Sequence, residues 1–545
     1  MKYFCLVVLL LTSIPAIGQQ HHTSSSEKKA AIVRGLGRVH HSVSTRNPRA
    51  QRFFDQGLAY MYAFNHQEAE RSFKRAAELD SRLAMAWWGV ALAVGPNYNL
   101  DVDPDREKQA YDAIQKALSL SSKAPENERA YIEALAKRYT DDPKADLKKL
   151  GVEYKNAMAA LVKRYPNDLD AATLYAESMM NLRPWQLWSH DGKPAEETEE
   201  IIAVLESVMR RAPHHTGANH YYIHAVEASP RPGRALASAR RLKTLAPTAG
   251  HLVHMPAHIY IRVGDYHGAV LANEAGAKAD ETYIKNNGAE SMYPMMYYNH
   301  NLHFLAIAAG FEGRFLTAKK AADQLQASTA PQAKQMPMLE AFVPTPTLIL
   351  VQFRRWDDIL KLSPPDPALP LNAAVWHFAR GVAQAASGRV KEAEGERDAL
   401  IEARKNLPAD MPWSLNKASD VLAIATDVLN AKIALAKSDR RSALELLRHA
   451  VTVEDSLAYD EPPSWYLPVR ESLGGALLGG REYAEAEKVF RAELERHPRS
   501  GRALLGLYES LKGQGKKTAA RSAWQEFQAA WKNSDTRLTI ESLSH

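Results

Sequence analysis

The chain has 545 residues, of which 46% are hydrophobic and 24% are charged, with 28 Gly and 29 Pro. These ordinary proportions exclude a collagen-like chain, a wholly disordered chain and a membrane protein with many spans. The 69 basic and 63 acidic residues are interleaved and leave a net charge of +6, which does not favour nucleic acid as a partner. A single cysteine excludes a disulfide framework and a cysteine-ligated zinc or iron–sulfur site.

Residues 1–18 have the pattern of a secretory signal peptide. Lys2 precedes a short apolar run from residue 4 to residue 11, and small residues follow up to Gly18. The run is shorter than the roughly 20 apolar residues that span a bilayer, although a retained anchor is the alternative. We therefore expect cleavage before Gln19, a periplasmic or secreted protein and no transmembrane span after signal removal. Cys5 would be lost with the signal.

Residues 19–49 are polar and lack periodicity until Ile32, which predicts a flexible leader. From residue 50 onward the chain shows amphipathic helical periodicity, interrupted by Pro or Gly, and no convincing alternating strand. The expected fold class is therefore all-α.

Small and large residues recur at fixed places along this helical region. The first pair of predicted helices carries Gly57, Tyr60, Ala69, Phe73 and Ala76. The same register returns at Ala235, Ala239 and Pro247, at Ala257, Tyr260, Gly264 and Ala269, and at Gly474, Tyr483, Ala486, Phe490 and Pro498. This pattern resembles the tetratricopeptide repeat (TPR), a helix–turn–helix of about 34 residues, in an exported bacterial-type protein.

The resemblance implies a solenoid over residues 50–532, with a concave wall made by the first helix of each pair. We divide it into N-terminal repeats at 50–165, central repeats at 166–330 and C-terminal repeats at 331–545. Three segments depart from the repeat: residues 94–106, residues 183–195, and about 15 extra residues between 279 and 298. Proteins with this fold mostly supply binding surfaces, and the fold alone does not define a function.

Histidines are concentrated in the central repeats. Ten of the 20 fall between residues 214 and 303. His220 and His254 are 34 residues apart, and so are His224 and His258, which places equivalent side chains on the concave wall. In the repeat register, His303 shares the position of His220 and His254, whereas His251 and His300 share another inner position. His214, His215 and His267 fall at junctions or turns and are expected to be bystanders.

The spacing of these histidines is compatible with a metal site. Residues four apart lie on one helix face, so His220 with His224, and His254 with His258, form two pairs. Glu227 lies one turn beyond His224, and Glu177 occupies the matching position of the preceding repeat. Imidazoles with a carboxylate suit a divalent transition metal such as Zn, Fe, Cu or Ni.

Two other interpretations stay open. The wall is also suited to a groove for a peptide, a protein segment or a small molecule, with His251, His300 and His303 along it and Trp185 and Trp188 on a possible lid. A purely structural hydrogen-bond ladder is the third interpretation. A distant polar cluster, Glu454–Asp455 and residues 460–466, is expected at a solvated junction unless the superhelix curls it back toward the histidines.

No phosphate loop, dinucleotide-binding turn, nucleophile elbow, haem-attachment motif or His-Glu-x-x-His run occurs in the sequence. The primary hypothesis is therefore an exported TPR-like solenoid that binds a ligand on a histidine-rich wall. The alternative is a metal-dependent enzyme whose histidine and glutamate site is built across adjacent repeats.

Overall fold

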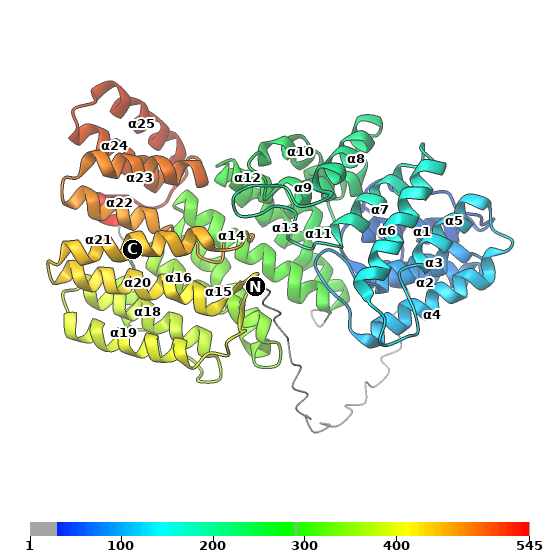
Figure 1. Ribbon diagram of the computed structural model, residues 1–545, viewed down its shortest axis with the longest axis horizontal. Helices are drawn as coiled ribbons and strands as arrows, with labels where there is room; N and C mark the ends of the chain where they lie inside the picture. The colour runs from blue at the N-terminus through cyan, green and yellow to red at the C-terminus, as the bar shows by residue number, and fades with distance from the viewer. Residues whose placement is uncertain (1–29, 289–290, 544–545) are drawn as a thin grey trace, which may run out of the picture.

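The computed structural model describes residues 30–288 and 291–543 and is a solenoid of antiparallel helix pairs (Figure 1). The predicted signal peptide and cleavage point at 1–18 lie outside the described residues. The N-terminal helices form one end of the molecule, the C-terminal helices form the other, and the central helices lie between them. None of the described helices combines the length and the apolarity needed to cross a membrane.

The N-terminal helices pair in sequence order. They are α1 (Pro48–Met61), α2 (His66–Leu79), α3 (Ala84–Val94), α4 (Pro104–Ser121), α5 (Glu126–Ala136), α6 (Leu147–Arg164) and α7 (Leu169–Met180). Helix α1 begins where the Asn47 side chain accepts hydrogen bonds from the backbone N–H groups of Arg49 and Ala50. Pro48 occupies the first turn, where its missing N–H costs nothing.

The central helices carry eight of the 20 histidines. They are α8 (Thr198–Arg211), α9 (Thr216–Val226), η1 (Pro232–Ala235), α10 (Leu236–Leu245), α11 (Gly250–His254), α12 (Pro256–Arg262), α13 (Tyr266–Asn287), the π-helical turn η2 (Pro294–Tyr298) and α14 (Asn299–Glu312). Pro256 separates α11 from α12, because a proline cannot donate the backbone hydrogen bond that would continue the helix. The extra residues predicted between 279 and 298 lengthen α13 and form η2.

The C-terminal helices complete the solenoid. They are α15 (Phe315–Ala333), η3 (Pro337–Phe342), α16 (Thr345–Gln352), α17 (Trp356–Leu360), α18 (Pro370–Ala386), α19 (Val390–Lys405), α20 (Ala418–Ala436), α21 (Arg440–Ser456), α22 (Val469–Gly479), α23 (Tyr483–Arg496), α24 (Gly501–Gly513), α25 (Lys517–Ala530) and η4 (Ile540–Leu543). Sequence periodicity did not predict the two-residue strands β1 (Pro412–Trp413) and β2 (Asn416–Lys417), which pair antiparallel between α19 and α20.

Glycines at the repeat positions allow adjacent helices to pack closely. A Cβ atom on Gly57 or on Gly89 would lie within 2.6 Å of the Phe73 ring, so Phe73 fills the space between α1 and α3 because both positions lack a side chain. Gly474 and Gly506 enclose the Phe490 ring in the same way near the other end. The TPR-like, all-α fold predicted from these positions is confirmed.

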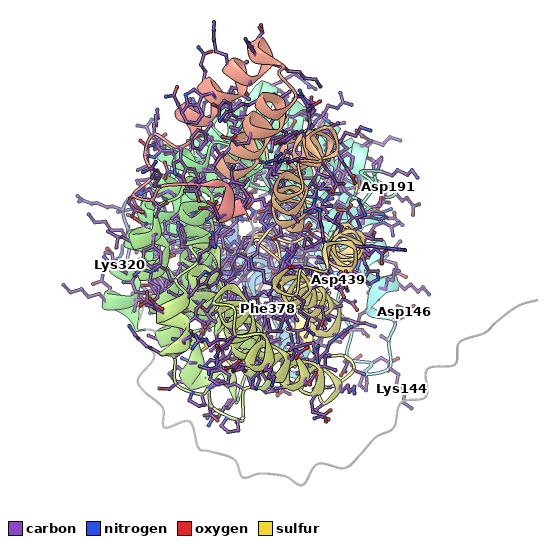
Figure 2. The ribbon with its side chains drawn as sticks, turned by 90° about the vertical axis from the view of Figure 1, so that its left-hand side faces the viewer. Lys144, Asp146, Asp191, Lys320, Phe378 and Asp439 are labelled. Atoms are coloured by element: carbon purple, nitrogen blue, oxygen red, sulfur yellow. The ribbon has the colours of Figure 1, made fainter. Side chains whose placement is uncertain are left out.

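The buried side chains form two large cores, one made by residues up to about 259 and one by residues from 257 onward. Phe378 lies inside the second core, whereas charged residues such as Lys320 and Asp439 project outward (Figure 2). The histidine-bearing helices α9, α11 and α12 lie where the two cores meet.

Residues 30–47 differ from the flexible leader that their polarity predicts. They follow the surface of the first half as an extended segment, held by side chains of the helices. The carboxylate of Glu128 accepts from the Ser44 hydroxyl at 2.7 Å, and that of Asp80 accepts from the Thr45 hydroxyl at 2.7 Å. The Gln56 side chain likewise binds the backbone N–H of Val33 at 2.8 Å. Tertiary hydrogen bonds thus order a segment without local periodicity.

Candidate metal centre

Six histidines form two groups of three. The first trio consists of His220 and His224 of α9 and His251 of α11; the second consists of His254 of α11, His258 of α12 and His300 of α14. In each trio, one ligand-capable atom from every residue lies within 4.8 Å of the others. Five of the six residues are at most 2% exposed, so these are interior sites rather than surface clusters.

The ring nitrogens of each trio approach one another through their Nε2 atoms. In the first trio, His220 Nε2 lies 3.2 Å from His224 Nε2 and 3.1 Å from His251 Nε2. In the second trio, His258 Nε2 lies 2.8 Å from His254 Nε2 and 3.3 Å from His300 Nε2. The central repeats thus build the same arrangement twice.

The outer nitrogens of four of these rings have acceptors as partners. His220 Nδ1 lies 2.7 Å from the Tyr62 carbonyl oxygen, and His254 Nδ1 lies 2.6 Å from the Asn273 side-chain oxygen. The Asn273 amide nitrogen donates to the Ala269 carbonyl, which fixes the orientation of that side chain. Because neither oxygen can donate, Nδ1 of His220 and of His254 carries the proton.

Glu227 holds the other two rings. Its carboxylate accepts from His224 Nδ1 at 2.9 Å and from His258 Nδ1 at 2.5 Å, and so connects the two trios from behind. Burial opposes ionisation of Glu227, but His258 and His224 lower its pKa to about 2. The carboxylate is therefore ionised and accepts both protons. Nδ1 of His224 and of His258 is also the protonated nitrogen.

These assignments leave unprotonated Nε2 atoms facing one another. When these rings are neutral, the Nε2 atoms of His220 and His224 present lone pairs to each other at 3.2 Å, and those of His254 and His258 do so at 2.8 Å. Such a contact is repulsive unless a cation lies between the nitrogens. A proton is disfavoured as that cation, because burial lowers the pKa of His220 and His254, and the neighbouring imidazoles lower it further.

The spacing of the nitrogens suits a metal ion. A tetrahedral site with metal–nitrogen bonds of about 2.0–2.1 Å places its ligand nitrogens about 3.3 Å apart. Three of the four Nε2 separations lie between 3.1 and 3.3 Å. The Nδ1 partners match the outer hydrogen bonds that orient metal-bound histidines in proteins. The residues present therefore fit a transition metal in each trio.

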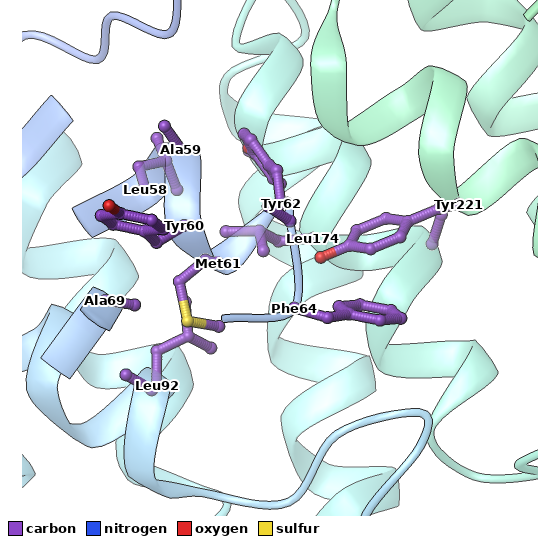
Figure 3. Close-up of a cluster of buried hydrophobic side chains, with 14 of the residues drawn as sticks. Leu58, Ala59, Tyr60, Met61, Tyr62, Phe64, Ala69, Leu92, Leu174 and Tyr221 are labelled. Atoms are coloured by element: carbon purple, nitrogen blue, oxygen red, sulfur yellow. The ribbon is translucent and has the colours of Figure 1, made fainter. Parts of the chain in front are cut away.

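One phenylalanine packs against each trio. Phe64, on the loop that follows α1, lies 4.5 Å from the His220 ring and 5.4 Å from the His251 ring, and Figure 3 shows it beside Tyr221. Phe304 of α14 lies 5.2 Å from His254 and 4.9 Å from His258. These rings exclude water from one side of each trio and limit ring rotation of the histidines.

The other side of the two trios opens on a cavity of about 600 Å³, here called the histidine cavity. His224, His251, His258 and His300 contribute to its wall. Most of the remaining wall is apolar or aromatic, including Phe64, Trp185, Tyr293, Tyr297, Phe342 and Trp413. The segments that interrupt the repeat supply much of it: Asn97 and Asn99 from the first, Trp185 from the second and Tyr293 and Tyr297 from the third.

Other predicted site residues lie apart from the trios. Glu177 is buried, and its carboxylate contacts Asn181. Trp185 lines the histidine cavity with its ring 5.8 Å from that of His224. The Trp188 indole N–H donates to the Ala225 carbonyl at 2.8 Å and so anchors its loop to α9. His303 lines the cavity without belonging to either trio.

The distant polar cluster does curl back toward the histidines. The same cavity is lined by Asp460, Glu461, Pro462 and Ser464. These residues are far from the histidines in sequence, but the fold brings both to one cavity. Burial raises the pKa of Asp460 to about 6 and that of Glu461 well above its usual range. The Tyr459 hydroxyl contacts Glu461, whose second oxygen is buried without a hydrogen-bond partner among the described residues. At neutral pH, this wall therefore carries less negative charge than two ordinary carboxylates would.

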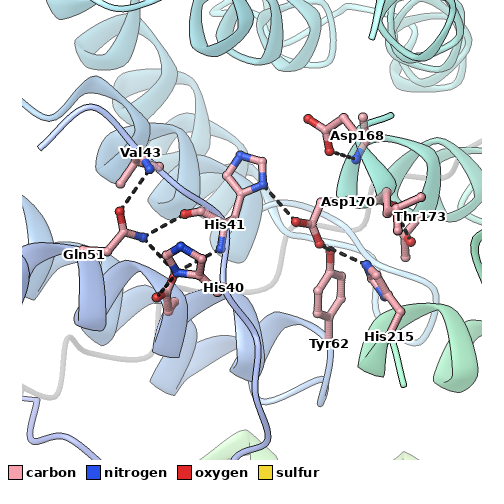
Figure 4. Close-up of polar contacts among 12 residues, drawn as sticks. His40, His41, Val43, Gln51, Tyr62, Asp168, Asp170, Thr173 and His215 are labelled. Atoms are coloured by element: carbon pink, nitrogen blue, oxygen red, sulfur yellow. Dashed lines mark hydrogen bonds and ion pairs between the residues drawn. The ribbon is translucent and has the colours of Figure 1, made fainter. Parts of the chain in front are cut away.

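One of the expected bystanders, His215, joins a different cluster, here called the clamp: His41, Tyr62, Asp170 and His215 (Figure 4). The Asp170 carboxylate accepts from His41 Nδ1 at 2.9 Å, from His215 Nε2 at 3.2 Å and from the Tyr62 hydroxyl at 2.5 Å. His267, by contrast, places its Nδ1 atom 2.8 Å from Glu312 and is half-exposed. The clamp attaches the N-terminal extended segment to the starts of α7 and α9.

Sequence reasoning missed Phe64, the clamp and the completion of each trio by His251 or His300. The repeat register does place His251 and His300 at one equivalent inner position, and that was the available signal. Phe64 adopts a positive φ of 56° in a short loop, for which no sequence pattern exists.

No family profile matches this chain, and no curated protein matches its sequence. Among solved structures, it is similar to human IFIT1 in a dimer with m7Gppp-AAAA, at 12% identity and a TM-score of 0.33, covering 90% of this chain and 91% of that one. It is also similar to yeast Tom70, at 13% identity and a TM-score of 0.29, covering 92% and 94%. The Cut9–Hcn1 hetero-tetramer of the APC/C gives 13% identity and a TM-score of 0.30, covering 91% and 75%. Similarity at this level carries no information on ligand or activity.

Proposed function

We propose that this protein holds two transition-metal ions, one in each histidine trio, and presents them to a small molecule in the histidine cavity. The observation that carries the proposal is the direction of the imidazoles. Four rings point unprotonated Nε2 atoms at one another, while acceptors hold their Nδ1 protons. Two hydrogen-bond acceptors at 2.8 Å repel each other unless a cation lies between them, and a metal ion is the cation that we propose.

A three-histidine ligand set favours a reactive site over a purely structural one. Structural metal sites fill all four positions with protein ligands, whereas three protein ligands leave a position for water or substrate. Bound there, such a metal can act as a Lewis acid or activate an oxygen ligand. The cavity of about 600 Å³ suits a small molecule, and its apolar and aromatic lining favours a ligand with a large apolar part.

The enclosure of the trios favours a small molecule over a peptide as the ligand. A peptide bound along a TPR-like concave wall would contact exposed side chains of successive repeats. His220 and His254 are instead fully buried, and His224, His251 and His258 are at most 2% exposed. A metal-dependent enzyme with its site built across adjacent repeats is the form of the proposal that these features support best.

Elemental analysis of protein purified without a histidine tag tests the proposal. Wild type reconstituted with metal and desalted should contain two ions per chain. His220→Ala removes a ligand of the first trio only, and His254→Ala removes a ligand of the second only, so each variant should retain one ion. His267→Ala changes a histidine outside both trios and should retain both ions. If wild-type protein contains no metal after reconstitution and desalting, the proposal is refuted.

We also propose that the protein is exported and works in the periplasm or outside the cell. The support is the pattern of residues 1–18, a basic start, an apolar run of signal-peptide length and a small-residue exit. Mass spectrometry of the protein recovered from its native cell should find an N-terminus near Gln19. Intact Met1 in the bulk of the protein would refute export without affecting the metal proposal.

A further inference from the structure

The opening of the histidine cavity carries methionine side chains. Met292, Met296 and Met338 all line the cavity. Met292 is 37% exposed and Met338 is 46% exposed, so both side chains contact solvent as well as lining the cavity. Few large apolar side chains of the described residues are exposed in this way. An opening that only admitted apolar molecules could be lined equally well by leucine or isoleucine, which lack sulfur.

These methionines come from two elements that lie on the same cavity. Met292 and Met296 are one helical turn apart in the segment that leads through η2 into α14. Met338 belongs to η3, more than 40 residues later in the chain. The two segments thus place thioethers on the wall of one cavity, which favours a joint role over accidental composition.

His303 is a further histidine on the wall of this cavity. It follows His300 by three residues on α14, and its ring lies 5.2 Å from that of Phe342, the last residue of η3. His303 is 8% exposed, lines the cavity, and its Nε2 has no partner among the described residues. This nitrogen is therefore available as a ligand.

We propose that Met292, Met296 and Met338 capture Cu(I) at the opening of the cavity and that His303 passes it to the trios, which makes copper the metal of the centre. Thioethers are soft ligands that select Cu(I), whereas imidazoles accept zinc, copper, iron and nickel alike. The thioethers at the opening would therefore select Cu(I) over the other metals before any ion reaches the histidines. The inference rests on the proposed metal function and adds the identity and the route of the ion.

The test compares Cu(I) loading of wild type with that of the triple variant Met292→Leu, Met296→Leu and Met338→Leu. Leucine preserves volume and apolarity, so the substitutions remove sulfur with little change in packing. The metal-free proteins receive Cu(I) under anaerobic conditions from a coloured Cu(I) chelate, and loading is followed by loss of its colour. We expect loading of the triple variant to slow by about tenfold, the lower end of the loss found when groups around a metal's ligands are replaced. Loading with Zn²⁺ should be unchanged.

The matched control is Met295→Leu with Met336→Leu. These residues neighbour the three methionines on the same segments but do not line the cavity, and the control should load like wild type. X-ray absorption of samples frozen during loading should detect copper–sulfur scattering in wild type that the triple variant lacks. In His303→Ala this sulfur-bound form should persist longer.

Equal Cu(I) loading rates for wild type and the triple variant would overturn the inference. In that case two ions per chain in the trios would still support the proposed function. Failure of the trios to take up any of the metals would overturn both.

Discussion

The two histidine trios with Glu227, here called the centre, and the clamp use the same residue types in different ways. In the clamp, the Asp170 carboxylate lies between two histidines, and both rings direct a nitrogen at it. In the centre, the Glu227 carboxylate lies behind two histidines and holds their outer nitrogens. In the trios the remaining Nε2 atoms of His224 and His258 face other imidazoles, whereas in the clamp the remaining Nδ1 atom of His215 accepts a backbone N–H.

His215 shows how a single backbone contact makes this choice. Its Nδ1 accepts a hydrogen bond from the Ala218 N–H at 3.1 Å, which caps α9. Nδ1 therefore carries the lone pair and Nε2 carries the proton, which it donates to Asp170. His220, five residues later on the same helix, has the opposite tautomer because its Nδ1 faces a carbonyl oxygen. A cluster of histidines and carboxylates is thus a candidate metal site only when the outer partners accept.

Metal-dependent stability should separate the two clusters most strongly. The double variant His224→Ala with His258→Ala removes one ligand from each trio, whereas His41→Ala with His215→Ala removes both histidines of the clamp. A ligand that binds only the folded state at a thousandfold excess over its Kd stabilises by about 4 kcal/mol per site. Wild type and the clamp variant should both gain this increment on adding metal, and the centre variant should lose most of it.

Urea unfolding with and without metal measures this increment. The clamp variant should be less stable than wild type in the metal-free state by about 2–3 kcal/mol, because Asp170 loses two of its three donors. A metal increment that disappears in the clamp variant and persists in the centre variant would reverse the assignment of the two clusters.

The fold was predictable from local sequence because its determinants are local. Phe73 needs a residue without a side chain on each neighbouring helix, and Gly57 and Gly89 stand 32 residues apart to provide it. This packing recurs around Phe490, so several copies of one pattern in the sequence carried the prediction. The extended segment at 30–47 has no such repetition, and its hydrogen bonds come from residues such as Glu128 that are distant in sequence.

The site was predictable in part. The 34-residue spacing predicted that His220, His224, His254 and His258 would lie near one another, and they belong to two adjacent trios. Their grouping could not be predicted, because it depends on the groups that hold each Nδ1 atom. The Tyr62 carbonyl that orients His220 is 158 residues away in the chain. The cavity was equally hidden, since the interruptions of the repeat and residues 460–464 meet only after the superhelix has formed.

Replacing Glu227 tests whether the carboxylate behind the trios orients their ligands. Glu227→Gln keeps the shape but removes the charge and one acceptor, so only one of His224 and His258 can still donate its Nδ1 proton to a carbonyl oxygen. Loss of such an outer partner typically costs about 10–100-fold in metal affinity. Competition with a chelator of known affinity should find this loss. Glu177→Gln changes a buried carboxylate outside the trios and should leave affinity unchanged.

The pH dependence of metal-free protein should distinguish the clusters by sign. In the centre, burial and neighbouring imidazoles lower the pKa of His254 in the folded state. The unfolded chain therefore binds more protons below about pH 6.5, and stability falls as pH decreases, with a slope of about 1.4 kcal/mol per pH unit for each such histidine. In the clamp, burial alone would lower the pKa of His41, but the hydrogen bond and charge of Asp170 outweigh it and raise the pKa. The contribution of His41 is thus complete below about pH 6.5 and is lost as pH rises through its folded pKa.

Urea unfolding of metal-free variants at pH 7.5 and pH 5.5 measures both signs. His254→Ala removes a group that destabilises the folded protein in acid, so its stability should fall less than that of wild type between the two pH values. His41→Ala removes a group that stabilises the folded protein in acid, so its stability should fall more than that of wild type. Equal pH dependence in the two variants would mean that the histidines of the centre are protonated like those of the clamp. Protons would then supply the cation between the Nε2 atoms, and the case for a metal would be lost.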